Sequence, residues 1–303
     1  MIEPMPALGV SLFTDGRAYA AGMVGWVFTR KGEVIRETAW YGADLAPEHL
    51  PHHFPAAVKL KGKCLSLVTE FAGNYGHYLL DGVARIGIAE KAGWPLEHFD
   101  HIYLQEPPSE SANRMLKALG VRPDRCVWAL ENPCVIAEQM VVTSFPGTRR
   151  NYSSVVPEVL SRPFRKPQSS GRRLYIPRMG ARKVENDHEI QRISSEFGLE
   201  IFDFSTSGDE LEAFRSASLI VGAHGAGLTN LAICMPGTRV LELLPSDHVY
   251  PYYYTVSEAA GLDYAYLVGQ SAGQREPGTF GPSPFDFWVD PSEYRDALAQ
   301  FTG

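Results

Sequence analysis

The second half of the chain alternates apolar, strand-like runs with segments of helical character. Strand-like runs lie at 173–176, 199–204 and 219–221, and another follows Gly237. Strands that alternate with helices at this spacing form parallel sheets, because each helix carries the chain back to the start of the next strand. The pattern predicts an α/β fold whose C-terminal domain is a doubly wound parallel sheet.

Capping signals set the expected ends of two helices in this half. Asn186 followed by Glu189 is a capping box, and Gly198 is a typical helix terminator. Ser207 followed by Glu210 is a second capping box, which predicts a helix over 211–217.

The first half has a less regular pattern, which is typical of a mixed α/β domain. An amphipathic helix is predicted over 75–92. The predicted strands are short runs separated by Gly, Pro and Asp turns, at 18–28, 33–40, 64–68, 102–105 and 139–143.

The stretch VVPEVLSRPFRKPQSSGRRLY is rich in Pro, Ser and Arg and indicates a domain boundary near residue 168. We therefore expect an N-terminal domain over 1–167 and a C-terminal domain over 168–270. Residues 271–303 form a Gly/Pro/Ser-rich tail with a helix-like end at 292–301, and we expect this tail to pack back onto the body.

Charge and composition exclude several classes of protein. The net charge of −7, with acidic and basic residues interspersed, argues against nucleic acid as a partner. The N-terminus lacks the pattern of a signal peptide, and no apolar run is long enough to span a bilayer. The expected location is cytoplasmic, with peripheral membrane association left open. The four cysteines lack metal-site spacing and are expected to be buried, reduced thiols.

A glycine-rich break, GAHGAG, follows the strand-like run at 219–221. It falls at the carboxyl end of a predicted parallel strand, where ligands bind in doubly wound sheets. Gly225 and Gly227 would let the backbone approach an anion, Ala226 would begin a helix with unpaired amides, and His224 would add a donor. These features predict a diphosphate cradle. The alternative is that the glycines only permit close packing of helix on strand.

Charged residues at the same predicted edge favour the cradle. Arg178 follows the first strand of the domain, and Arg182 lies one turn further on. Guanidinium groups pair bidentately with phosphate, so both are candidate diphosphate ligands. Glu242 is expected at the end of the next strand, where a carboxylate would accept hydrogen bonds from ribose hydroxyls.

A polar stripe runs along the helix predicted over 75–92. Asn74, His77, Asp81 and Arg85 are spaced for one helix face, and an ordinary solvated face would carry mostly Lys, Glu and Gln instead. The stripe predicts the wall of a substrate site, with a solvated helix face as the alternative. Asp81 is the predicted general base, with His77 orienting the acceptor or the donor phosphate, and the reverse assignment stays open.

Three segments of the chain resemble glycosyltransferase family 61, which includes capsular-polysaccharide-type bacterial transferases. The resemblance spans about residues 70–245, and Pro177 departs from it at a position where the family usually has Ser, which removes one hydroxyl contact to phosphate. The matching residues are Asn74, Tyr75, Gly76, His77, Leu79 and Asp81; Tyr175, Ile176, Arg178, Ala181, Arg182, Asn186 and Asp187; Val221 to Asn230; and Pro236, Gly237, Val240, Leu241 and Glu242.

The resemblance implies a GT-B architecture, in which two Rossmann-like domains face a cleft. It implies that a nucleotide-sugar donor binds to the C-terminal domain, and a UDP-sugar is slightly favoured. A glycan or glycolipid acceptor is expected to bind mainly to the N-terminal domain. Thr229 and Asn230, within the last matching segment, are expected to bind substrate. The implied reaction is transfer with inversion at the anomeric carbon, in surface or capsular polysaccharide synthesis.

No metal or other cofactor is expected. Transferases that use a divalent cation usually present Asp-x-Asp, which occurs nowhere in this chain. Helix amides and arginines can stabilise a leaving diphosphate in place of a metal. Two alternatives stay open: a nucleotide-sugar epimerase or hydrolase, and a non-catalytic protein that binds nucleotide sugars or glycans.

Overall fold

The chain folds into two compact units, Met1–Pro163 and Phe164–Gly303. The structure is a computed structural model that describes residues 8–20, 24–38, 53–148, 151–164, 171–207, 209–276 and 283–302. The predicted boundary between residues 167 and 168 lies outside the described residues. Each unit has its own sheet and is considered by itself below.

The C-terminal unit contains a sheet of order β10-β9-β11-β12-β13-β14. Strands β9 to β13 are all parallel, and β14 pairs antiparallel with β13. The prediction of an α/β fold with a parallel sheet in this half is confirmed. The elements are β9 (Arg172–Ile176), α4 (Asp187–Glu196), β10 (Glu200–Ile201), α5 (Glu210–Ser216), β11 (Ala217–Ala223), η9 (Ala226–Ile233), β12 (Arg239–Pro245), α6 (Tyr252–Ala260), β13 (Asp263–Ser271), β14 (Phe287–Trp288) and α7 (Pro291–Thr302).

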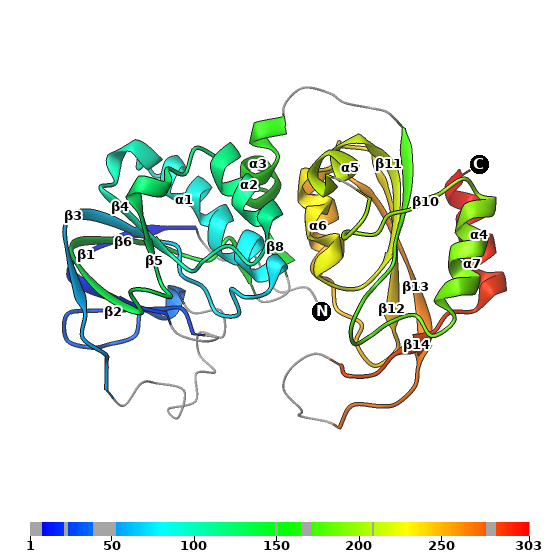
Figure 1. Cartoon of the computed structure of the whole chain (residues 1–303), viewed down its shortest axis with the longest axis horizontal. Helices are drawn as coiled ribbons and strands as arrows, with labels where there is room; N and C mark the ends of the chain where they lie inside the picture. The colour runs from blue at the N-terminus through cyan, green and yellow to red at the C-terminus, as the bar shows by residue number, and fades with distance from the viewer. Residues whose placement is uncertain are drawn as a thin grey trace. The chain divides into compact units, whose positions relative to one another are not determined.

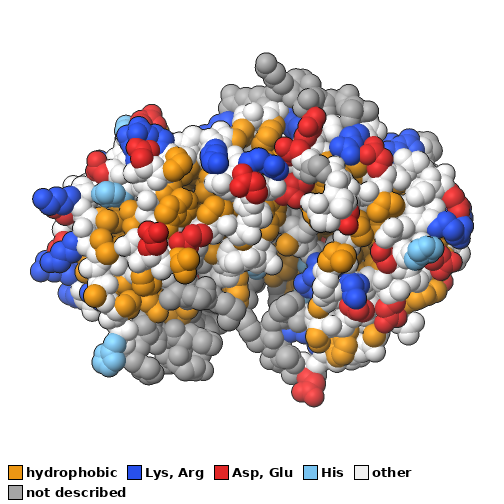
Figure 2. All heavy atoms as spheres, in the orientation of Figure 1, with side chains coloured by type: hydrophobic (Ala, Val, Ile, Leu, Met, Phe, Trp, Pro, Cys, Tyr) orange, Lys and Arg blue, Asp and Glu red, His pale blue; other side chains and the backbone are white. Residues whose placement is uncertain are grey.

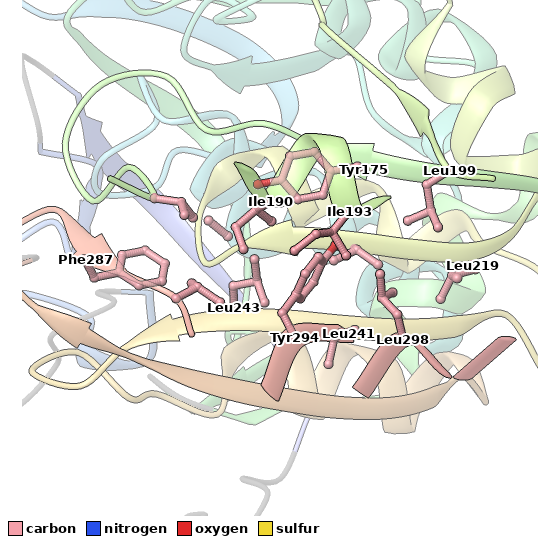
Figure 3. Close-up of a cluster of buried hydrophobic side chains, with 14 residues drawn as sticks. Tyr175, Ile190, Ile193, Leu199, Leu219, Leu241, Leu243, Phe287, Tyr294 and Leu298 are labelled. Carbon is pink, nitrogen blue, oxygen red and sulfur yellow. The ribbon is translucent and has the colours of Figure 1, made fainter. Parts of the chain in front are cut away.

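Helices cover both faces of this sheet. In Figure 1, α5 and α6 lie on one face, and α4 and α7 lie on the other. The core beneath α4 and α7 joins Ile190 and Ile193 of α4 to Tyr294 and Leu298 of α7 and to strand residues such as Leu241 (Figure 3). Burial of this apolar layer is the main force that holds the helices to the sheet.

The strand order contains one switch point, between β9 and β11. From β9 the chain passes through α4 to β10 on one side, and then through α5 to β11 on the other side of β9. Ligands in doubly wound sheets bind at the carboxyl ends of the two strands where the order reverses. The residues that follow Ile176 and Ala223 therefore occupy the expected binding position.

Both predicted capping boxes are wrong in detail. Asn186 does precede α4, but its amide nitrogen donates to the Val289 carbonyl at 2.9 Å and its Oδ1 accepts from the Val289 N–H at 3.1 Å. Helix α5 is capped by Asp209, whose Oδ1 accepts from Leu211 N–H at 2.9 Å. Ser207 instead accepts a hydrogen bond from the Asp203 N–H. Asn186 and Ser207 thus each form a hydrogen bond with another backbone group instead of the cap that the local pattern predicted.

The tail belongs to the C-terminal unit. Its predicted helix is confirmed as α7, which packs on α4. Strand β14 was not predicted, because its two residues extend an existing sheet edge and have no periodic pattern of their own.

The N-terminal unit contains a mixed sheet of order β2-β1-β6-β3-β4-β5. Strands β6, β3, β4 and β5 are parallel, and β1 pairs antiparallel with β2 and β6. The predicted run 18–28 is two strands rather than one. The described part of 33–40 contains a single β-bridge, from Val34 to Phe28, followed by the short helix η1. The elements are β1 (Val10–Tyr19), β2 (Trp26–Phe28), η1 (Arg36–Thr38), β3 (Val58–Ser66), η4 (His77–Gly82), η5 (Val83–Arg85), α1 (Ile86–Lys91), η6 (Leu96–His98), β4 (His101–Leu104), α2 (Glu110–Ala118), η7 (Pro123–Arg125), β5 (Cys126–Trp128), β6 (Cys134–Thr143), β7 (Gly147–Thr148), β8 (Asn151–Tyr152), α3 (Val155–Leu160) and η8 (Arg162–Phe164).

The helix predicted over 75–92 is irregular and buried all round. It begins with the π-helical turn η4, continues as the 3₁₀ turn η5 and ends as α1. Residues 78–89 are buried throughout, so the predicted division into a polar and an apolar face is wrong. Helix α3 packs against it so closely that a Cβ on Gly87 would lie 2.1 Å from the Val159 side chain. Helix α3 therefore covers one side of this helix and contributes to its burial.

The predicted mixing of charges and the predicted burial of the cysteines are borne out in part. On the face shown in Figure 2, acidic and basic side chains lie interspersed. Cys64, Cys134 and Cys234 are buried, whereas Cys126 is only partly buried. Within the described ranges, no helix has both the length and the apolar character needed to cross a membrane.

Candidate functional site

A histidine and an aspartate form a pair on η4 of the N-terminal unit. His77 Nδ1 lies 2.6 Å from Asp81 Oδ2. The other aspartate oxygen, Oδ1, accepts a hydrogen bond of 2.9 Å from the Tyr152 hydroxyl on β8. The stripe residues His77 and Asp81 are thus brought together, and Tyr152 is added from 71 residues away in the sequence.

The exposure of the two side chains favours the reverse of the predicted base assignment. Asp81 is 1% exposed and both its oxygens accept hydrogen bonds, whereas 26% of the His77 side chain is exposed. Because Asp81 engages Nδ1, His77 would exchange a proton with a substrate through Nε2. The arrangement is that of a base oriented by a buried carboxylate.

The two ends of the predicted stripe have structural partners. Asn74 Oδ1 accepts from the Gly76 N–H at 2.8 Å, so it caps the start of the helix. Arg85 is fully buried and donates to Val68 O at 2.9 Å, to Thr143 Oγ1 at 2.8 Å and to Thr143 O at 3.1 Å. Burial lowers the pKa of Arg85 to about 10, and the charge of Asp81 partly opposes that shift. These contacts do not support the predicted substrate-binding role of Arg85.

We expect the Arg85→Met variant to lose stability rather than substrate affinity. Methionine keeps the apolar stem but leaves two buried carbonyls and one hydroxyl without their donor, which should cost about 3 kcal/mol of the free energy of unfolding. Urea unfolding followed by circular dichroism measures this loss. Normal stability combined with weakened substrate binding would instead return Arg85 to the substrate site.

In the C-terminal unit, Arg178 lies directly against the glycine break. A Cβ on Gly225 would lie 1.4 Å from Arg178 Nη1, a distance no real contact allows. The backbone of Gly225 is extended, with φ of 161°, so glycine is required here for space rather than for conformation. The missing side chain at Gly225 therefore lets the Arg178 guanidinium approach the backbone at the end of β11, at the switch point.

The neighbouring glycines serve packing. A Cβ on Gly227 would lie 3.1 Å from the Phe204 ring, and one on Gly222 would lie 3.1 Å from Ile176 and Leu228 side chains. For Gly227 this contact agrees with the packing alternative, and the predicted approach to an anion stays a prediction. Ala226 begins η9 as predicted, although η9 is a 3₁₀ helix rather than an α-helix. Its first N–H groups still lack partners within the helix.

Among the described residues, Arg178 and Arg182 form no salt bridge with a carboxylate, although Asp286 attracts Arg178 and Asp247 attracts Arg182 from nearby. Both are half-buried. Burial lowers the pKa of Arg178, and burial followed by the charge of Arg178 lowers the pKa of Arg182 to about 10. Cations gathered at a cost in desolvation and mutual repulsion are typical of anion-binding sites.

The second histidine–carboxylate pair is deeply buried. His224 Nδ1 lies 2.5 Å from Glu242 Oε1, and the Tyr264 hydroxyl donates to Glu242 Oε2 at 2.5 Å. Glu242 lies inside β12 rather than at its end, is 0% exposed and has both oxygens engaged. In this structure Glu242 orients His224, and its predicted contact with ribose hydroxyls stays a prediction.

Thr229 and Asn230 are buried within η9. The Thr229 hydroxyl lies beside the buried Tyr253 hydroxyl, whose pKa is raised mainly by burial. Nothing in this placement brings either residue to the exposed edge of the site, so their predicted substrate contacts stay predictions.

The sequence analysis did not identify two residues of these sites, Tyr152 and His248. Tyr152 has no recognisable pattern around it, because its importance comes from a contact with a distant helix. His248 follows the carboxyl end of β12, and that position could have marked it. Its Nε2 lies 2.8 Å from Arg182 Nη1.

Replacing Gly225 with valine should weaken nucleotide binding while the fold survives. The new side chain would occupy the space of the Arg178 guanidinium, and losing one charge-assisted contact costs roughly 10- to 100-fold in affinity. Calorimetric titration with UDP and GDP measures the effect. Gly9→Val is the control, because a Cβ on Gly9 would meet nothing within 4 Å. Unchanged affinity in a folded Gly225→Val protein would refute the site.

Comparison with known proteins decides the family. A family model described as glycosyltransferase 61 matches residues 75–241. The chain belongs to glycosyltransferase family 61. The resemblance inferred from its motifs is thereby confirmed, and the match includes the His77–Asp81 pair and the switch point of this family 61 chain.

Two curated relatives of this family 61 chain are plant enzymes. A β-1,2-xylosyltransferase of Oryza sativa subsp. japonica is 38% identical over 64 residues, which are 21% of this chain and 12% of that protein. A β-1,2-xylosyltransferase of Arabidopsis thaliana is 36% identical over 56 residues, which are 18% of this chain and 10% of that protein. The matched segments thus span about a tenth of the length of these relatives.

Proposed function

We propose that this chain is a glycosyltransferase that moves a sugar from a nucleotide-sugar donor to a hydroxyl of a glycan acceptor. Membership of family 61 supports the reaction class. The predicted GT-B arrangement of the two units stays a prediction.

The donor proposal rests on one observation: Arg178 and Arg182 lie together at the switch point of the sheet, and neither forms a salt bridge with another described residue. Dinucleotides and mononucleotides place their phosphates at this position in doubly wound folds. The first amides of η9 provide further donors for a diphosphate. The His224 ring, held at Nδ1 by Glu242, adds a donor at Nε2 only as the imidazolium.

The acceptor proposal rests on the His77–Asp81–Tyr152 chain of hydrogen bonds. In a single displacement, the acceptor oxygen attacks the anomeric carbon and the bond from that carbon to the diphosphate oxygen breaks. His77 takes the acceptor proton, and the arginines stabilise the charge that develops on the leaving diphosphate. Such a displacement inverts the anomeric configuration.

A panel of nucleotide sugars tests the proposal. UDP-xylose comes first, because both named relatives are xylosyltransferases, and other UDP-, GDP- and CMP-sugars follow. A transferase releases free nucleotide only with an added glycan acceptor. Release without an acceptor indicates the hydrolase alternative, an altered sugar on intact nucleotide indicates the epimerase, and thermal stabilisation without turnover indicates the binding protein.

Three further expectations stay predictions. They are the independence from metal, the cytoplasmic location with or without peripheral membrane association, and the role in surface or capsular polysaccharide synthesis. Within the described residues no cluster of three or more His, Cys, Asp or Glu side chains is arranged to hold a metal ion. The effect of a chelator on turnover decides the question of metal.

A further inference from the structure

Arg182 is held in place by His248 and by an unusual backbone conformation. Arg182 Nη1 lies 2.8 Å from His248 Nε2. A guanidinium only donates hydrogen bonds, so Nε2 must be the accepting nitrogen and the ring proton must lie on Nδ1. The backbone of Arg182 has φ of 64°, in the left-handed region that residues other than glycine rarely adopt. Strained backbone of this kind persists where the surrounding structure enforces it, often at functional sites.

His248 is kept uncharged by its surroundings. Its side chain is 5% exposed, and its Nδ1 is buried without a hydrogen-bond partner within the described ranges. Burial above all, and then the nearby positive groups, lower the pKa of His248 to about 2. These groups are His224, Arg182, Arg275 and Arg178.

Because the His248 ring is neutral, it orients Arg182 without offsetting the positive charge of that side chain. A buried arginine is usually oriented by a carboxylate, which cancels its charge as well as fixing its position. The nearby carboxylate of Asp247 attracts Arg182, but its two oxygens accept hydrogen bonds from Ser271 and Ser283. Because Arg182 has no carboxylate bound directly to it among the described residues, we take its positive charge to be available to an anion.

We propose that His248 is a positioning residue that orients Arg182 toward the diphosphate of the donor while leaving the guanidinium charge available to it. This inference rests on the proposed function, since it takes the diphosphate of a nucleotide sugar as the ligand. It also assigns a role to the loop after β12, which lies beyond the residues matched by the family model.

The variants His248→Gln and His248→Glu form a matched pair that differs mainly in charge. Either side chain can accept a hydrogen bond from Arg182, but only glutamate would neutralise it. Calorimetric titration with inorganic pyrophosphate and with UDP should show the glutamine variant within about threefold of wild type and the glutamate variant at least about tenfold weaker. Binding of uridine, which has no phosphate, should be equal in both variants.

The outcomes separate this inference from the proposed function. Wild-type protein that binds neither pyrophosphate nor UDP would overturn both. Wild-type binding that is weakened by Arg178→Ala, together with equal affinities of the two His248 variants, would overturn the role of His248 alone. Should both variants fail to fold, ¹⁵N NMR of the histidine rings in wild-type protein at pH 7 decides. The proposal requires a buried neutral ring protonated at Nδ1, and a spectrum without such a ring contradicts it.

Discussion

Replacing His77 with alanine should lower kcat by roughly 10²- to 10⁴-fold, the range typical of losing a general base. The reason is geometric: His77 is the partly exposed member of a pair whose other member, Asp81, is buried with both oxygens engaged. Steady-state kinetics with a nucleotide sugar and its glycan acceptor measure the change. Nucleotide affinity should stay normal, because the donor phosphates are assigned to residues of the other unit.

Further variants distinguish His77, the proposed base, from Asp81, the residue that orients it. Imidazole added to the buffer should restore part of the rate to His77→Ala, because a small base can enter the space of the missing ring. Asp81→Asn should also be slowed, by about a hundredfold, but without rescue. His98→Ala, at an exposed position of the same unit, should leave turnover unchanged. Near-normal turnover of both His77→Ala and Asp81→Asn would place the base elsewhere.

Replacing Arg178 with alanine should reduce transition-state stabilisation by about 2–4 kcal/mol, seen as a fall in kcat/KM. Arg178 lies against Gly225 at the switch point and forms no salt bridge with another described residue, although Asp286 attracts it from nearby. We therefore expect its charge to stabilise a leaving diphosphate. The loss should be the same with and without EDTA if arginine rather than a metal ion stabilises the diphosphate.

The matched control for Arg178→Ala is Arg192→Ala. Arg192 is an exposed residue of α4 that pairs with Glu196 one turn away, so its loss should leave kcat/KM unchanged. Activity that disappears in EDTA and returns with Mg²⁺ or Mn²⁺ would show that a metal ion performs the role assigned to Arg178.

Local sequence patterns were sufficient to predict the strands and helices beside which the candidate residues lie. The alternation of apolar runs and helical segments determined the parallel sheet, since strand length and helix length are properties of short windows. It also placed Arg178 and His224 immediately after strands, and the carboxyl ends of parallel strands meet at one edge. The family was recognisable for the same reason, because its motifs are contiguous.

Tertiary structure decided which of these residues are accessible and what each one contacts. Glu242 was expected at an exposed strand end but is buried against His224 and Tyr264, and Arg85 was expected on an open face but is bonded to Thr143. Tyr152 reaches Asp81 across 71 residues of sequence. Burial and hydrogen-bond partners depend on which distant segments pack together, and no window of the sequence contains both partners. The sequence by itself determined the strands and the positions of the ionisable groups beside them, whereas long-range packing decided which groups bind ligands and which stabilise the fold.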